Sequence, residues 1–177
     1  SAGFLGQEGT LKNSDRQQFN MRTNLDIKLS EKFSMRTNMA FIHNQYSEPN
    51  ASYGGGYKQL IWQSNRMAPW IPYKKEDGSY GSISDGNPAA WIDIDSRKNY
   101  LVQNFSGVLA FDYHIMDGLT FTLQGAYVTD IKETKDYRKE CWYDEVNYHG
   151  PDQLTETIVR WNRYTLDALL NYSKSFN

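Results

Sequence analysis

The sequence has one cysteine, no excess of basic residues and no long apolar run. A single thiol, Cys141, can form neither an intrachain disulfide nor a zinc cluster that needs several thiolates. The formal net charge of -2 gives no electrostatic reason to expect a nucleic-acid partner. The mean hydropathy is -0.73, and no segment has the length and apolarity of a transmembrane helix. No charged segment followed by an apolar one occurs at Ser1, so no signal peptide is predicted within these residues.

The sequence does contain a regular alternation of apolar and polar residues over residues 17–29 and 33–45. One parity is free of charge and carries Phe19, Met21, Thr23, Leu25, Ile27, Leu29, Phe33, Met35, Thr37, Met39 and Phe41. A period of two is that of a β-strand, whose side chains point alternately to two faces. The polar run from Ser30 to Lys32 therefore predicts a turn between two antiparallel strands.

The same alternation returns in three later segments, two of which are joined by the tight turn Met116-Asp117-Gly118. Residues 1–6 look like the end of a first strand, and a further short turn is expected around Ser175. We therefore predict an all-β fold, an antiparallel meander of about six strands. The strands are expected near residues 1–6, 17–29, 33–45, 100–115, 119–131 and 158–172.

Two long polar connections separate these strands, at residues 46–99 and 132–157. The first contains Gly54-Gly55-Gly56, every proline except Pro151, and turn signals such as Asp77-Gly78 and Asp85-Gly86. Long and short connections alternate along the chain, which is typical of outer-membrane barrels with short periplasmic turns and longer extracellular loops. An open meander of six strands leaves two unpaired edges, so we expect this sheet to be part of a larger transmembrane barrel.

A soluble β-sandwich that binds carbohydrate is the alternative interpretation. In a sandwich the apolar rows would face a second sheet, and the aromatic residues of the long connection would form a sugar platform. Exclusion of charge from one face does not separate the two folds, because a protein core and lipid both exclude it.

Three stretches resemble the SusC/RagA family of TonB-dependent outer-membrane transporters. They are Gln7-Glu8-Gly9 followed by Phe19, Arg22, Asn24 and Leu25; Asn65-Arg66-Met67-Ala68-Pro69-Trp70-Ile71-Pro72-Tyr73 with Asp77-Gly78-Ser79-Tyr80-Gly81; and Asp85-Gly86-Asn87-Pro88-Ala89-Ala90-Trp91. They occur in order across most of the chain.

The resemblance implies a 22-stranded barrel, with a separate plug domain, in the outer membrane of a Gram-negative, Bacteroidetes-like bacterium. Such a transporter imports glycans or peptides beneath a SusD-like surface lipoprotein, and a TonB complex supplies the energy. We expect this chain to carry about six of the strands and to lack the plug and the TonB-contacting segment. The polar face would then look into the barrel lumen; it carries Arg22, Asp26, Lys28, Arg36, Asp112 and Asp167.

The connection of residues 46–99 supplies the candidate residues for binding a substrate or partner: Trp62, Arg66, Trp70, Tyr73, Tyr80 and Trp91. Aromatic rings offer flat apolar faces on which the C–H faces of sugars can stack, and exposed aromatic surfaces commonly mark binding regions. The alternative is that these rings pack the loop against itself or against the lid protein.

No chemistry of its own is expected for this chain. Asp85, Asp93 and Asp95 do not have the spacing of a calcium-binding loop, and the three histidines are scattered, so we expect no metal and no cofactor. Glu140 and Glu145 permit a glycosidase interpretation, which needs two carboxylates on either side of the bond. No catalytic sequence motif supports an enzyme.

Overall fold

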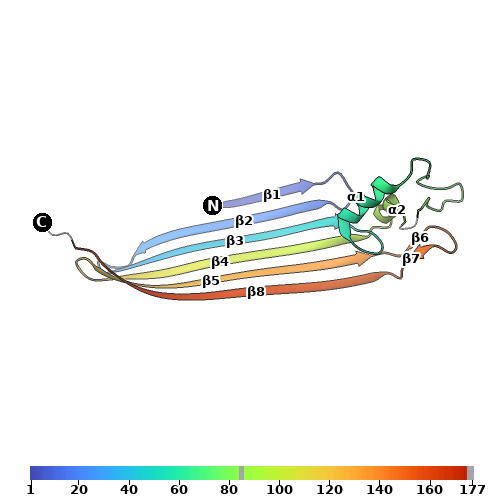
Figure 1. Cartoon of the computed structure of the whole chain (residues 1–177). Helices are drawn as coiled ribbons and strands as arrows, with labels where there is room; N and C mark the ends of the chain where they lie inside the picture. The colour runs from blue at the N-terminus through green and yellow to red at the C-terminus, as the bar shows by residue number, and fades with distance from the viewer. Residues whose placement is uncertain (84–85, 175–177) are drawn as a thin grey trace.

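The computed structural model describes residues 1–83 and 86–174. The predicted turn at Ser175 and the residue Asp85 lie outside these ranges. The chain forms an antiparallel six-stranded sheet with the order β1-β2-β3-β4-β5-β8 (Figure 1). Its strands are β1 (Ala2–Glu8), β2 (Asp15–Lys28), β3 (Phe33–Pro49), β4 (Arg97–Met116), β5 (Leu119–Arg138) and β8 (Gln153–Tyr172). The predicted all-β meander is confirmed.

Short turns join the strands at one end of the sheet. Between β2 and β3, the Ser30 hydroxyl accepts hydrogen bonds from the backbone N–H groups of Lys32 and Phe33. Between β4 and β5, Gly118 has a φ of 81°, and a Cβ there would lie 2.2 Å from the carbonyl oxygen of Ser173. Only glycine fits this turn without strain. The long connections all lie at the opposite end (Figure 1).

The strand registers divide the side chains between two faces, because residues that oppose each other in an antiparallel pair share a face. The apolar face carries Phe19, Met21, Leu25, Ile27, Phe33, Met35, Met39, Phe41, Phe105, Leu109, Phe111, Tyr113, Phe121, Leu123, Tyr127, Tyr164, Leu166 and Leu170. The six charged residues expected on the polar face do share that face, where Arg36 and Asp112 form a bidentate ion pair of 3.0 and 3.1 Å.

Nothing within the described residues covers the apolar face. Leu166 and Tyr164 both lie on the apolar face, yet Leu166 is 77% exposed and Tyr164 is 76% exposed. The accessible surface of the chain is 11996 Å², whereas a compact monomer of this mass would expose about 8,900 Å². The sheet is therefore a single layer, and the described ranges contain no second sheet that could make a sandwich of it.

The strands extend further than the alternation predicted. Residues 46–49, 97–99, 132–138 and 153–157 were expected in the two long connections, but they continue β3, β4, β5 and β8. The reason is that both faces carry polar side chains at this end of the sheet, so the contrast between the two parities disappears there. Backbone pairing continues, as in the opposed residues Glu48 and Lys98.

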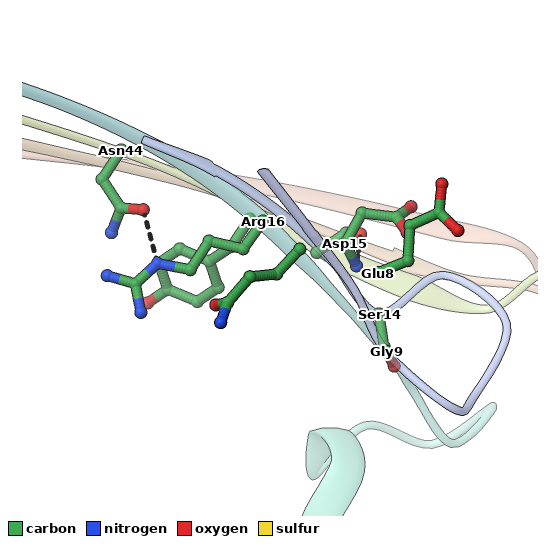
Figure 2. Close-up of a pocket in the computed structure, with 9 residues that line it drawn as sticks. Glu8, Gly9, Ser14, Asp15, Arg16 and Asn44 are labelled. Atoms are coloured by element: carbon green, nitrogen blue, oxygen red, sulfur yellow. Dashed lines mark hydrogen bonds between the residues drawn. The ribbon is translucent and has the colours of Figure 1, made fainter. Parts of the chain in front are cut away.

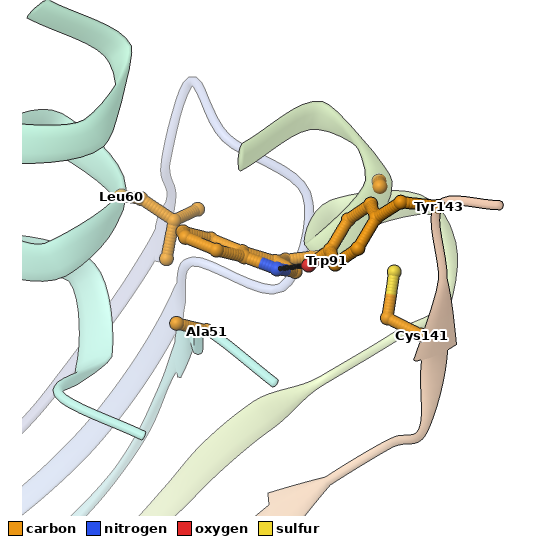
Figure 3. Packing of buried hydrophobic residues seen from close by; sticks show 6 residues of the cluster. Ala51, Leu60, Trp91, Cys141 and Tyr143 are labelled. Atoms are coloured by element: carbon orange, nitrogen blue, oxygen red, sulfur yellow. Dashed lines mark hydrogen bonds between the residues drawn. The ribbon is translucent and has the colours of Figure 1, made fainter. Parts of the chain in front are cut away.

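The two long connections fold together into a small unit at this end of the sheet, which we call the cap (residues 50–83, 86–96 and 139–152). It contains helix α1 (Gly56–Arg66), helix α2 (Pro88–Asp93) and a hairpin of β6 (Cys141–Trp142) and β7 (Tyr148–His149) (Figure 1). Its buried cluster consists of Ala51, Leu60, Ala90, Trp91, Cys141 and Tyr143 (Figure 3). The irregular loops predicted from the sequence are thus partly helical and share one apolar core.

Buried polar contacts fix the cap to the sheet. The side chain of Asn50 donates to Asp136 at the end of β5 (2.7 Å) and accepts from the backbone N–H of Gly56 at the start of α1 (2.8 Å). The Ser96 carbonyl accepts from the backbone N–H of Asn50 (2.9 Å), and the Ser96 hydroxyl accepts from that of Lys139 (2.9 Å). These contacts tie the ends of β3, β4 and β5 together, so the cap has a fixed position relative to the sheet.

Both helices have local reasons to begin where they do. Asn87 caps α2, because its side chain accepts hydrogen bonds from the backbone N–H groups of Ala89 and Ala90, and Pro88 fits the first helical position. The start of α1 follows Gly54 and Gly55, which both have positive φ angles. Neither described helix is long and apolar enough to cross a lipid bilayer.

Trp91→Ala should unfold the cap locally, because Trp91 is completely buried in its core. We expect a loss of roughly 3 to 5 kcal/mol in the stability of the cap. Trp70→Ala is the matched control, since Trp70 is 82% exposed and its removal should cost less than about 0.5 kcal/mol. Native-state hydrogen exchange of the α1 amides measures the change in cap stability in both variants. Equal protection in the two variants would contradict this assignment of the core.

Candidate functional site

The candidate Trp91 lies inside the cap. Its indole N–H donates to the Tyr143 hydroxyl at 2.6 Å, and its ring meets that of Tyr53 edge to face at 5.3 Å between centroids. Figure 3 shows its ring between Leu60 and Tyr143. Trp91 thus belongs to the core of the cap and offers no free ring face to a ligand.

Two other candidates, Trp62 and Arg66, form a pair on the exposed side of α1. They are four residues apart and therefore neighbours on the helix surface. The guanidinium carbon of Arg66 lies 4.2 Å from the centroid of the Trp62 ring, and Trp62 is 50% exposed. Tyr57 and Ile61 are also exposed on this helix. The result is an apolar helix surface that carries positive charge.

A third exposed ring, Trp70, follows α1 in a turn closed by a hydrogen bond from the N–H of Ile71 to the carbonyl of Ala68. Tyr73 and Tyr80 come next, and the structure brings them together, with ring centroids 5.9 Å apart. Both hydroxyls donate to the Asp93 carboxylate, and the Lys74 ammonium lies 5.4 and 5.2 Å from the two ring centroids.

Asp93 and the two tyrosines shift each other's pKa values. The hydrogen bond from Tyr73, followed by that from Tyr80, lowers the pKa of Asp93, because both donors stabilise the charged carboxylate. Burial raises the pKa of Tyr80 to about 12, helped by its hydrogen bond to Asp93. At neutral pH the group is therefore one carboxylate held by two neutral phenols.

A second polar group lies at the β6–β7 hairpin. His149 Nδ1 lies 3.1 Å from the Ser52 hydroxyl and 3.2 Å from the Tyr143 hydroxyl. Burial raises the pKa of Tyr143, so this phenol is neutral and able to donate. Burial also raises the pKa of the Cys141 thiol, which makes it a poor nucleophile. This group joins the hairpin to the rest of the cap.

The polar face of the sheet carries a further group that the sequence analysis did not identify. We call it the polar-face patch; its residues are Arg16, Tyr46, Tyr100, Lys132, Trp161 and Arg163. Tyr46 and Tyr100 are opposed on β3 and β4, and their rings stack at 4.6 Å between centroids. Tyr46 was predicted to lie in a loop, so only the observed register reveals this neighbour relation.

Cations lie beside three of these rings. Arg16 is the register partner of Tyr46, the Lys132 ammonium lies 5.5 Å from the centroid of Tyr100, and the Arg163 guanidinium lies 4.7 Å from that of Trp161. Figure 2 shows the hydrogen bond from Arg16 to Asn44. Both residues line an open depression of about 560 Å³. The patch lies on the polar face at the end of the sheet that carries the cap.

The described residues contain no group of three or more His, Cys, Asp or Glu side chains that could hold a metal ion. Of the two glutamates considered for catalysis, Glu140 accepts a hydrogen bond from the Trp142 indole at 2.8 Å. Glu145 is exposed in the β6–β7 turn. Glu140 therefore has a local structural partner in the hairpin.

No protein-family profile matches the chain. The chain is similar to the TonB-dependent receptor P26 of Formosa agariphila, with 30% identity over 123 residues. This similarity covers 64% of the chain but only 11% of the relative, so the chain spans about a tenth of the length of the protein it matches. It supports a relation to TonB-dependent receptors at that general level.

The Asp93 group predicts how the cap responds to pH. Because the pKa of Tyr80 is raised from 10.0 to about 12, its contribution to stability is fully present below pH 10 and is lost as the pH rises toward 12. Asp93 has a lowered pKa, so its contribution is present above about pH 4 and is lost as the pH falls through the lowered value.

Asp93→Asn should therefore lower the pKa of Tyr80 toward 10. The near-ultraviolet tyrosinate absorbance of each protein, minus that of its Tyr80→Phe counterpart, gives the Tyr80 titration. Asp95→Asn serves as the control, because Asp95 pairs with Arg97. An unchanged Tyr80 titration in Asp93→Asn would mean that Asp93 does not act on this phenol.

Proposed function

We propose that this chain is a wall segment of a SusC-like TonB-dependent transporter in the outer membrane of a Gram-negative, Bacteroidetes-like bacterium. The apolar face contacts lipid, the polar face lines the lumen, and the cap is extracellular. The similarity to a TonB-dependent receptor supports the general class. The observation that carries the proposal is the uncovered apolar face of the single-layer sheet.

The dimensions of the apolar face fit a membrane. On β4 its residues run from Phe105 to Ile115, and ten residues at about 3.3 Å each span about 33 Å along the strand. At a tilt of about 40° this gives a height of about 25 Å, which is the height of the apolar band in outer-membrane barrels. Contiguous apolar surface of this extent marks a membrane or protein contact in a folded protein.

Aromatic residues lie near both limits of this face. At the end with the short turns, Phe33 and Tyr113 stack at 4.6 Å, and Phe121 opposes Tyr113. Near the other end a row crosses four strands and consists of Phe41, Phe105, Tyr127 and Tyr164. Such rows correspond to the aromatic girdles that outer-membrane barrels place at the two lipid–water interfaces.

The sheet also has the edges of an open wall. Among the described strands, β1 pairs only with β2 and β8 pairs only with β5, so one side of each has unpaired backbone donors and acceptors. Within lipid such groups need partners, and only a closed barrel provides them to every strand. We propose that neighbouring strands of a 22-stranded barrel pair with both edges.

The cap then forms part of the extracellular chamber. Its exposed rings Trp62, Trp70 and Tyr73 suit the C–H faces of glycans, and a SusD-like lipoprotein would close the chamber above them. Peptides are the alternative cargo. The proposal assigns no catalytic step and no cofactor to this chain, and energy would come from a TonB complex through other parts of the transporter.

Leu109→Lys tests which solvent the apolar face contacts. Leu109 is central on that face, and a lysine there should cost roughly 2 to 4 kcal/mol if it faces the middle of the bilayer. Val108→Lys is the matched control, because the adjacent residue points to the polar face. The folded outer-membrane fraction of the intact protein, scored by heat-modifiable mobility on gels, should fall only for Leu109→Lys. Equal effects of the two lysines would contradict the proposal.

Trp70→Ala tests the role of the cap. Loss of one stacking ring should weaken oligosaccharide binding by the intact transporter roughly two- to tenfold. Val146→Ala is the control, since Val146 is also highly exposed, in the β6–β7 turn, but offers no ring. Calorimetry with a panel of oligosaccharides and peptides gives the affinities. Unchanged affinity for every ligand that binds would remove Trp70 from the site.

A further inference from the structure

We propose that the polar-face patch is a binding site for a saccharide chain that carries carboxylate or sulfate groups. This inference rests on the proposed function, because it takes the polar face to line a lumen, and it adds a class of substrate and a second site. The site lies on the wall of the barrel next to the cap, apart from the exposed rings of the cap itself.

The three cations of the patch have no carboxylate partner within the described residues. Three other cations on this face do have carboxylate partners: Arg36 pairs with Asp112, and Lys98 and Arg138 pair with Asp136. Arg16, Lys132 and Arg163 form no ion pair within residues 1–83 and 86–174. Three cations that face the same lumen thus keep their full charge for a ligand.

Arg16 is held in place by neutral groups. Its Nε donates to the Asn44 side-chain oxygen at 3.0 Å (Figure 2). One terminal nitrogen donates to the side-chain oxygen of Gln18 at 2.7 Å. These contacts orient the guanidinium without neutralising it, and they leave further N–H groups for an anion. A guanidinium can bind a carboxylate or a sulfate through two parallel hydrogen bonds.

Two carboxylates of the polar face near the patch accept hydrogen bonds from neutral donors, and two more, Glu8 and Asp15, line the depression beside Arg16. Glu48 accepts from the Tyr100 hydroxyl at 2.6 Å, and Asp130 accepts from the Asn104 side chain. They offset part of the positive charge but do not bind the three cations. The three cations therefore keep N–H groups that an anionic ligand can bind directly.

The spacing of the cations favours a chain over a small anion. Arg16 lies on β2 and Lys132 on β5, three strand spacings apart, which is about 14 Å. The stacked rings of Tyr46 and Tyr100 lie between them. One phosphate or sulfate ion does not span this distance, whereas a polymer with repeated negative charges can contact both cations.

The aromatic residues favour a saccharide over an acidic polypeptide. Tyr46 and Tyr100 cover each other's faces, but Trp161 is 44% exposed and has Arg163 beside it. An indole face suits the C–H face of a sugar ring, and the adjacent guanidinium suits an acidic substituent of the same ring. The amides of Gln18, Asn20 and Asn44 can bind sugar hydroxyls.

The test compares cations on the two faces of the sheet in the intact transporter, purified in detergent. The variants are R163Q and the triple variant R16Q/K132Q/R163Q. The matched control is R160Q, because Arg160 lies on the same strand but on the apolar face, opposite Ile131. Three probes of equal length separate the sources of charge: oligogalacturonate with carboxylates, carrageenan oligosaccharides with sulfates, and neutral maltooligosaccharides.

The wild-type protein should bind at least one anionic probe roughly tenfold or more tightly than the neutral one, with an affinity that falls as salt is added. The triple variant should lose that advantage, by roughly tenfold or more, and R160Q should stay within about twofold of wild type. W161A should weaken binding as well, and W161F should recover most of it, which separates ring stacking from a general loss of structure.

Several results would overturn the inference. They are equal affinity for neutral and anionic probes, an unchanged affinity in the triple variant, or an equal loss in R160Q. Faster proteolysis of a plug domain in the triple variant, with saccharide binding intact, would identify an acidic polypeptide as the occupant instead. If the wild-type protein folds as a heat-modifiable barrel and gives any of these results, only the proposed site on the polar face is refuted. A protein absent from the outer membrane refutes the proposed function and the site with it.

Discussion

Backbone hydrogen bonding across six strands holds this structure together, and no second layer within residues 1–83 and 86–174 covers the large apolar face of the sheet. In most domains the apolar faces of secondary structure are buried against each other, and that burial supplies most of the stability. Here the strand pairing is continuous over up to 20 residues, as between β5 and β8, yet residues such as Leu166 remain exposed. The environment of the sheet must therefore complete its stability.

The cap has its own core because the sheet cannot provide one. Trp91, Leu60 and Tyr143 come from distant parts of the chain and bury each other beyond the ends of the strands. Polar contacts, and Asn50 in particular, join this core to the sheet. If the sheet faces lipid as proposed, apolar burial within the cap operates above the membrane, and hydrogen bonds operate at the junction of the cap with the sheet.

The sequence was sufficient to predict the number and order of the main strands, because apolar and polar residues alternate regularly in them, with one parity free of charge over residues 19–29 and 33–41. The prediction of strand ends was wrong at the end of the sheet that carries the cap, because both faces carry polar side chains there. Tyr46 and Tyr137 continue their strands with polar residues on both parities, so alternation could not assign them. The register that stacks Tyr46 on Tyr100 is a property of strand pairing, which no local pattern encodes.

The cap was less predictable for a related reason. α1 contains only 11 residues and begins at the third of three consecutive glycines, so its local signal is weak, and it is stabilised by contacts with α2 and the end of β3. Composition identified the aromatic residues of this region but could not separate the buried Trp91 from the exposed Trp70. That difference depends on the Tyr143 hydroxyl, which is supplied by a connection more than fifty residues further along the chain.

The distribution of charge on the polar face follows from the same division of environments. Near the short turns, Arg36 and Asp112 neutralise each other and are held at fixed distances. Near the cap, Arg16 is oriented by Asn44 and Gln18, which leave its charge available. A wall that only needed to be hydrated would gain nothing from orienting an uncompensated guanidinium with two neutral amides. A wall that receives an anionic ligand does gain, because the cation is already positioned and little side-chain entropy is lost on binding.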